Sequence, residues 1–302
     1  MTDVAANAPL RIDGFFKRVA KEFVEDPVAI GGLVLFILIA VIAVAAPWIA
    51  PQNPYDLAQL DIMDGGLPPG EVSFGTGQTY WLGTDQQGRD MASAIMYGLR
   101  ISLLVASVSL GLAITIGTVV GVTAAYFGGR LDSFIMRIVD LQLSFPAILI
   151  ALILLALLGR GVDKVILALV IVQWAYYART VRSSAIVERR KDYIEAARCL
   201  ALSNRRIMFR HLLPNCVPPL IVVATVQIAQ AIALEATLSF LGVGVPITEP
   251  SLGLLIANGY DFLLSGRYWI SLFPGIALVI TIIAINLVGD RLRDVLNPRL
   301  SS

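Results

Sequence analysis

Residues 28–50 read VAIGGLVLFILIAVIAVAAPWIA, and no charged side chain interrupts them. An uncharged apolar run of about 18 residues or more is long enough to cross a bilayer as a helix. The run is too long for the roughly 7–15-residue apolar core of a signal peptide, and residues 1–26 before it are polar and charged. We therefore expect a retained membrane helix that stops at Pro51.

Five further apolar segments follow this one. They cover residues 101–126, 143–158, 165–181, 217–245 and 270–288. The composition agrees, since 57% of the 302 residues are hydrophobic and only 15% are charged, against about 25% charged in soluble domains. The third and fourth segments fall short of the roughly 20 residues needed to span, so we expect them to extend into their charged flanks. The sequence predicts an all-α integral membrane protein of six transmembrane helices.

The distribution of Lys and Arg predicts the orientation. If the N-terminus is cytosolic, eighteen of the 23 basic residues lie on the cytosolic side and five lie outside. Because basic residues accumulate in cytosolic loops, both termini are predicted to be cytosolic. The net charge of +1 provides no global basic field for binding nucleic acid.

The longest outer loop, residues 51–100, is acidic and rich in turn-forming residues. Turn sequences occur at Asn53-Pro54, Gly65-Gly66 and Pro68-Pro69-Gly70. We expect irregular structure in this loop and no folded domain.

Two features within the predicted spans bear on packing and polarity. Gly117 and Gly121 form a small-xxx-small pattern, which predicts a closely packed helix seam, although glycine is also common in membrane helices. Glu235 lies in the middle of the fifth span, where an ionisable side chain is costly. It can line a transport pathway, pair with a basic group or act as a protonated structural hydrogen-bonding group, and the sequence does not choose among these.

The start of the third span combines charge and a helix breaker. Asp132, Arg137 and Asp140 cluster there, and the i,i+3 spacing of the last two predicts an ion pair. Pro146 is expected to kink the helix, because it lacks a backbone donor.

Residues 183–216 form the largest predicted cytosolic loop. One short helix is predicted from Asp192, as its cap, to about residue 200. A second is predicted to begin at Ser203 or Asn204 and to end at Pro214. Such an amphipathic pair can lie on the membrane surface or enter a groove on a soluble partner, and periodicity does not decide between these.

The same loop resembles the EAA loop of importer permeases of the binding-protein-dependent ABC class. The resemblance rests on Glu195-Ala196-Ala197, then Ala201, and finally Leu213-Pro214-Asn215. The family has glycine at the position of Ala201, and alanine disfavours a positive φ, so the sharpness of the turn is open. His211 stands where the motif has isoleucine; as the sole histidine, it is interpreted as structural.

Further motifs narrow the resemblance to the C-type subunit of the dipeptide/oligopeptide permease family. The most distinctive is Leu82-Gly83-Thr84-Asp85-Gln-Gln-Gly88-Arg89-Asp90, whose periplasmic Asp85, Gly88, Arg89 and Asp90 are candidate site residues. Others are Tyr97-Gly98-Leu-Arg100, Tyr126-Phe-Gly128-Gly129, Leu238-Ser239-Phe240-Leu241-Gly242 and Asn286-Leu-Val-Gly289-Asp290. The resemblance extends from about residue 12 to residue 300.

The resemblance implies a type I ABC importer permease, multi-pass in the bacterial inner membrane, that translocates short peptides. It divides the chain into a cytosolic tail (1–26), a first helix with periplasmic loop (27–96), a permease core (97–290) containing the EAA loop (183–216), and a second tail (291–302). The implied partners are a second homologous permease, two ABC ATPases, a periplasmic or lipid-anchored binding protein and membrane lipid. The chain has no G-x-x-x-x-G-K-[ST] motif, so ATP and Mg would be bound by the ATPases. No catalytic residue, cofactor or metal is expected in this chain.

The sequence leaves three alternatives open. The same machinery can carry nickel, glutathione, haem precursors or antimicrobial peptides. A proton-driven secondary peptide transporter would tend to have several deep ionisable groups and repeated halves, whereas this chain has one deep acid and no visible repeat. An intramembrane hydrolase needs a nucleophile and a base within reach, but the sole histidine lies in the cytosolic loop.

Overall fold

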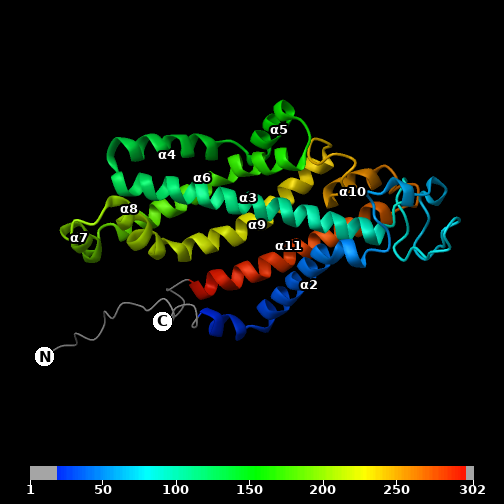
Figure 1. Cartoon of the computed structure of the whole chain (residues 1–302), viewed down its shortest axis with the longest axis horizontal. Coiled ribbons are helices and arrows are strands. Elements are labelled where there is room, and N and C mark those ends of the chain that lie inside the picture. Colours follow the sequence, from blue (N-terminus) through cyan, green and yellow to red (C-terminus); the bar gives the residue numbers. More distant parts are fainter. Residues whose placement is uncertain (1–18, 297–302) are drawn as a thin grey trace.

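The chain folds into an elongated bundle of helices (Figure 1). A computed structural model describes residues 19–296; residues 1–18 and 297–302, which hold most of the first predicted tail and part of the second, lie outside the described residues. Five long helices run along the bundle: α2 (Pro27–Ile49), α3 (Met91–Phe127), α6 (Val162–Glu188), α9 (Val217–Phe240) and α11 (Trp269–Leu296). Within residues 19–296, all five are long and apolar enough to cross a membrane.

The predicted third span is a pair of helices joined by a sharp bend. Helices α4 (Gly129–Ser144) and α5 (Ala147–Leu158) meet at 92°, so the described residues contain six spans only if this pair counts as one. Phe145 is extended, at φ −94° and ψ 144°, because a residue before proline avoids the helical region, and Pro146 then caps α5. The predicted kink at Pro146 is confirmed, and it is a complete break between two helices.

The helix ends also differ from the expected spans. Helix α3 begins at Met91 and not at residue 101, so the predicted division between residues 96 and 97 falls within a helix. Its 37 residues, at about 1.5 Å each, exceed the roughly 30 Å hydrocarbon core, so α3 projects beyond it. Helix α6 continues to Glu188 and takes the first part of the predicted 183–216 loop, and α9 ends at Phe240, before the predicted residue 245.

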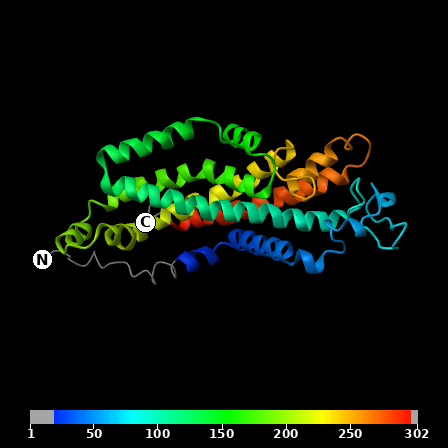
Figure 2. The ribbon, with the colours of Figure 1, turned by 45° about the horizontal axis from the view of Figure 1, so that its top comes forward.

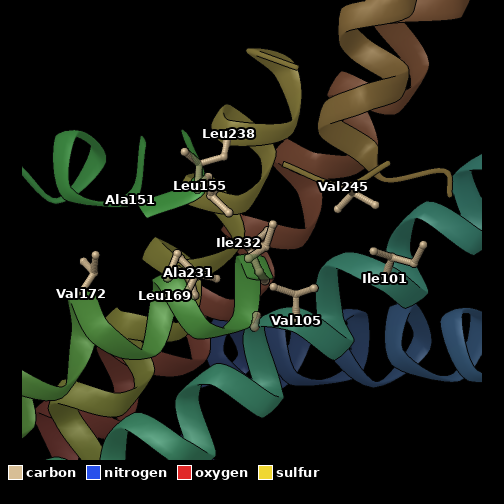
Figure 3. Packing of buried hydrophobic residues seen from close by; sticks show 14 of the residues in the cluster. Ile101, Val105, Ala151, Leu155, Leu169, Val172, Ala231, Ile232, Leu238 and Val245 are labelled. Carbon is tan, nitrogen blue, oxygen red and sulfur yellow. The ribbon is translucent and has the colours of Figure 1, made fainter. Parts of the chain in front are cut away.

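The core lies where α3, α5, α6 and α9 converge (Figure 3). Its buried side chains include Val105 from α3, Leu155 from α5, Leu169 from α6 and Ile232 from α9. Helix α5, too short to span alone, therefore completes the core from the side, and the bend before it makes this contact possible.

The predicted glycine seam is confirmed between α3 and α6. A Cβ on Gly117 would lie 2.4 Å from the carbonyl oxygen of Trp174, and one on Gly121 would lie 2.5 Å from that of Ala178. No larger residue fits without moving a helix backbone, so glycine permits this close approach.

The ion pairs of α4 differ from the prediction. Asp132 pairs with Arg182 at 2.6 Å, and Asp140 pairs with Arg179. Both acids thus bind α6, and the expected pair between Arg137 and Asp140 is wrong, because the helix packing brings α6 arginines closer than the neighbour on α4.

The bundle has two contrasting ends (Figures 1 and 2). One end carries the short helices α7 (Asp192–Cys199) and α8 (Asn204–Arg206), and the first turns of α2 and the last turns of α11 lie toward it. The opposite end carries residues 51–90, which we call the polar cap, together with α10 (Leu252–Tyr260).

Candidate functional site

Helix α7 carries three of the residues predicted to form the coupling loop. Ile194 and Ala197 are buried, whereas Glu195 and Ala196 are exposed. Lys191 occupies the cap position and its side chain makes no capping hydrogen bond, so the predicted capping role of Asp192 is wrong. Asp192 and Glu195 instead lie in the first turn, where a negative charge suits the positive end of the helix dipole. The helix therefore has one anchored face and one free face.

The turn after α7 is built around Ala201, at the position where the family has glycine. Ala201 adopts a left-handed conformation, with φ at 51°. The backbone N–H of Leu202 donates to the carbonyl of Ala197 at 3.2 Å, and that of Ala201 donates to Arg198 at 2.9 Å. These two bonds form a Schellman motif, which usually places glycine at this position. The turn is sharp even with alanine, at a local cost of about 1–2 kcal/mol.

The segment after this turn stays helical up to the membrane span. Helix α8 continues as a π-helical turn over Ile207–Leu212 and a 3₁₀ turn over Leu213–Cys216, and α9 follows directly. The prediction that Pro214 ends the helix is wrong. Pro214 stands at the start of the 3₁₀ turn, where a missing N–H is tolerated, and the Asn215 side chain donates to the His211 carbonyl at 2.9 Å.

A buried apolar cluster anchors this coupling segment, which we define as residues 189–216. It packs Ile194 and Ala197 of α7 and four residues of the following turns against α3 and α6. The four are Ile207, Met208, Leu212 and Cys216; their partners include Val122, Ala125, Tyr126, Tyr177, Val181 and Ala185. Because interiors are close-packed, displacing the coupling segment must displace the ends of both spans.

Polar contacts reinforce this anchor at Tyr126. Arg189 donates from Nη1 to the carbonyls of Ala125 and Tyr126, at 2.6 and 2.9 Å, which satisfies the last turn of α3. The Tyr126 hydroxyl donates to Asn204 at 2.7 Å, and the Arg198 guanidinium lies 5.5 Å from the centre of the Tyr126 ring. Sequence reasoning did not assign this role to Tyr126, although the Tyr126-Phe-Gly128-Gly129 motif marked its position.

The remaining predicted coupling residues follow α7 in the chain. Ala201 and Pro214 are exposed and Leu213 is half-buried. The exposed basic side chains of the coupling segment include those of Arg198, Arg205, Arg206 and Arg210. His211 is half-buried, and its Nε2 has no hydrogen-bond partner among residues 19–296.

At the opposite end, the structure brings the periplasmic motif residues together. Arg89 donates from Nε to the Asp85 carboxylate at 2.6 Å, with both side chains almost fully buried. Asp90 caps α3 and accepts from the backbone N–H and the hydroxyl of Ser93, at 2.8 and 2.6 Å. Gly88 has φ at 74°, and a Cβ there would meet the Asp61 carbonyl at 2.1 Å, so only glycine fits.

The polar cap is irregular, as predicted, but it has a buried polar interior. Gln52 accepts from the N–H of Asp90 at 2.5 Å, which ties the end of α2 to the start of α3. Asp64, fully buried, accepts from the Tyr80 hydroxyl and the Phe74 N–H, both at 2.9 Å. Burial raises the pKa of Asp64, but the hydrogen bonds from Ser73, Phe74 and Tyr80 together bring it below its ordinary value.

Glu235 is fully buried between α9 and α3. It accepts hydrogen bonds from the hydroxyls of Ser102 and Ser239, both at 2.8 Å, and no basic side chain pairs with it among the described residues. Ser239 also accepts from the N–H of Val245 at 3.3 Å. The structure thus shows no basic partner for Glu235 among the described residues, and its role stays a prediction.

Comparison with known families matches most of the chain. Residues 117–302 match the family described as binding-protein-dependent transport system inner membrane component. Residues 14–69 match the N-terminal transmembrane domain of oligopeptide transport permease C. The chain belongs to the binding-protein-dependent permease family. It is therefore a multi-pass protein of the inner membrane.

Curated relatives cover nearly the whole permease. It is 42% identical over 269 residues to a putative peptide transport system permease protein of Brucella suis biovar 1, covering 89% of this chain and 87% of that one. It is 39% identical over 278 residues to a dipeptide transport system permease protein of Escherichia coli K12, covering 92% and 91%. A di/tripeptide transport system permease protein of Pseudomonas aeruginosa is 35% identical, covering 95% and 93%.

A solved structure shares the fold of this permease. A chain of the inward-facing MetNI methionine ABC transporter superposes with a TM-score of 0.55 at 23% identity, covering 68% of this chain and 98% of that one. The predicted all-α fold of an ABC importer permease is confirmed.

Proposed function

We propose that this permease carries short peptides, di- or oligopeptides, across the bacterial inner membrane as one subunit of an ATP-binding-cassette importer. The names of its curated relatives, which refer to peptide or dipeptide transport, support this cargo. One observation carries the mechanism: α7 presents Glu195 and Ala196 to solvent while its other face is fastened to two membrane spans.

The coupling segment would transmit force from a separate motor. An ATPase subunit would receive the free face of α7 in a groove, as amphipathic helices are received by partner proteins. Closure of two such ATPases would move α7, and the apolar anchor and the Tyr126 contacts would pass this movement to α3 and α6. ATP must bind one arrangement more tightly than the other for this to do work. The ATPases would bind ATP and Mg²⁺, and this chain would be non-catalytic and without cofactor.

The remaining partners follow from the two ends of the bundle. A second, homologous permease would complete the pathway, and membrane lipid would surround the outer faces of both. The α7 end and both termini would face the cytosol. The polar cap would face outward and receive the periplasmic or lipid-anchored binding protein, and no nucleic acid would bind.

The test is capture of the ATPases by variants of exposed glutamates. Glu195→Lys should abolish co-purification of the ATPases and peptide uptake, while the protein still inserts in the membrane. Glu71→Lys makes the same charge change at an exposed site in the polar cap, at the opposite end of the bundle, and should leave co-purification of the ATPases unchanged. Normal ATPase capture by Glu195→Lys would contradict the proposed coupling.

The cargo needs its own experiment. The binding protein that co-purifies with the complex should release short peptides on denaturation, identified by mass spectrometry. Recovery of nickel or glutathione in place of peptides would refute the proposed cargo but leave the proposed coupling mechanism standing.

A further inference from the structure

A cavity opens at the polar-cap end of the permease, between the polar cap, the turn before α6, the segment after α9 and helix α10. Its volume is about 360 Å³, within the roughly 300–1,000 Å³ typical of sites for small molecules. Its polar lining includes Asp85, Arg89, Arg160, Ser239, Asn258 and Asp261. The cavity is far from the coupling segment, so the proposed coupling gives it no role.

Arg89 brings unused hydrogen-bond donors to this cavity. Its side chain lines the cavity although the residue is only 2% exposed. Its Nε binds Asp85, but Nη1 and Nη2 have no hydrogen-bond partner among residues 19–296. A guanidinium offers five N–H donors in a planar fork. These two nitrogens face the cavity, so an acceptor that enters it can bind them without displacing a partner within the described residues.

The position of Arg89 is fixed before any ligand arrives. Asp85 accepts from both the backbone N–H and Nε of Arg89, at 3.0 and 2.6 Å. The next residue, Asp90, caps α3, and Gly88 makes the tight turn between Asp85 and Arg89. A donor held in place by its own backbone loses little entropy on binding.

A second guanidinium and a second acid in the cavity lining restrict the charges that a ligand can carry. Arg160, which is exposed, lines the cavity beside Gly242, and Asp261 lines it from the end of α10. Two arginines match the planar geometry of a carboxylate. The acids Asp85 and Asp261 disfavour a multiply charged anion but suit a molecule that also carries an ammonium group. The lining therefore fits a zwitterion.

We propose that this cavity receives the free C-terminal carboxylate of the peptide cargo, with Arg89 and Arg160 as its donors. The inference rests on the proposed function, because it takes the cargo to be a peptide. It adds a substrate subsite within the permease itself, distinct from recognition by the binding protein.

The experiment compares two cargoes in the complete transporter, reconstituted in vesicles with its binding protein. Uptake is measured for alanyl-alanine and for alanyl-alanine amide, which lacks the carboxylate. In Arg160→Gln, the ratio of acid to amide uptake should fall about tenfold, the scale of one charge-assisted hydrogen bond. The binding protein is unaltered, so its own preference cancels between variants.

Two further variants complete the design. Arg267→Gln removes an exposed arginine at the same end that does not line the cavity, and should leave the ratio unchanged. Arg89→Lys keeps the charge beside Asp85 but loses the planar fork, and should lower the ratio; co-purification of the complex checks its assembly. An unchanged ratio in Arg160→Gln with normal peptide uptake overturns the subsite alone. Failure of the unaltered transporter to import either peptide overturns the proposed function as well.

Discussion

At the scale of single residues, local chemistry and packing compete at two positions. Ala201 takes a backbone conformation that suits glycine, because the Schellman bonds and the contact of Leu202 with the buried cluster outweigh the local cost. Glu235 stays in an apolar interior because two serine hydroxyls satisfy its carboxyl oxygens. A substitution at each of the two positions can test this explanation.

Ala201→Gly should stabilise the turn after α7. Glycine adopts φ of about +50° without a Cβ penalty, so local opening should become harder by about 1 kcal/mol. Hydrogen exchange of the amides after α7 should slow roughly fivefold. Ala196→Gly is the matched control, since it makes the same change at an exposed helical position and should speed exchange. Faster exchange in Ala201→Gly would contradict this account.

Replacing Glu235 by Gln should be milder than replacing it by Lys. The glutamine amide can still accept from one serine and donate to the other, so about 1 kcal/mol should be lost. Lysine would bury a charge with no acid beside it, at roughly 3 kcal/mol or more. Thermal unfolding of the purified permease measures both, and equal losses would rule out burial as the cause.

At the scale of elements, two junctions determine how the helices meet. The glycine seam draws α3 against α6, and the break before α5 lets this helix bury Ala151 and Leu155 in the core. The polar cap joins the ends of α2 and α3 through hydrogen bonds rather than through regular secondary structure.

Gly117→Ala should destabilise the seam by about 1–3 kcal/mol, the usual cost of overpacking. The new Cβ would lie too close to Trp174 and to the Cβ of Tyr177, at 2.4 and 2.6 Å. Gly111→Ala makes the same change on the same helix with no atom within 4 Å, and should be neutral or slightly stabilising. Thermal unfolding of both variants provides the comparison, and equal stability would contradict the packing argument.

The polar cap should lose stability in acid through Asp64. The pKa of Asp64 is lowered in the folded state. Its contribution is therefore fully present above the ordinary carboxyl value of about 4, and is lost as the pH falls through the lowered folded value. Tyr80, whose pKa is raised to about 12 by burial and by Asp64, stays protonated throughout this range.

Proteolysis of the cap as a function of pH measures this effect. In the unaltered protein, cleavage within residues 51–90 should increase below about pH 4. Asp64→Asn should be cleaved faster at neutral pH and should lose most of the acid dependence. Identical pH profiles for the two proteins would exclude Asp64 as the responsible group.

At the scale of the whole molecule, the chain is one permease subunit of a larger importer. The coupling segment and the polar cap lie at opposite ends of the bundle, as required by the proposed docking of an ATPase at one end and a binding protein at the other. Large apolar side chains are exposed along the bundle, as on α2 at Val34, Ile37 and Val41, where lipid would cover them.

Reporter fusions should establish the orientation. A fusion after residue 75 should report the periplasm and one after residue 200 should report the cytosol, because the basic residues favour an inward-facing α7 end. A reporter active only in the cytosol and one active only in the periplasm should give opposite patterns. The reverse pattern would place the coupling segment in the periplasm, where it could not contact cytosolic ATPases.

The sequence by itself determined the membrane class, five of the spans, the glycine seam and the position of the coupling motif. These features are local. Long apolar runs, a four-residue glycine spacing and a short motif can be recognised without knowing which residues pack against them. The sequence also predicted the position of the bend at Pro146, but it predicted a kink and not a complete break.

Only the tertiary structure decided the partners of Asp132, Asp140, Glu235 and Arg89. Each pairing joins residues whose positions depend on packing or on a loop path, as when α6 outcompetes Arg137 for Asp140. The continuous path through Pro214 likewise depends on π and 3₁₀ turns held by buried contacts. Pairings across elements depend on three-dimensional proximity, which hydrophobic periodicity does not encode.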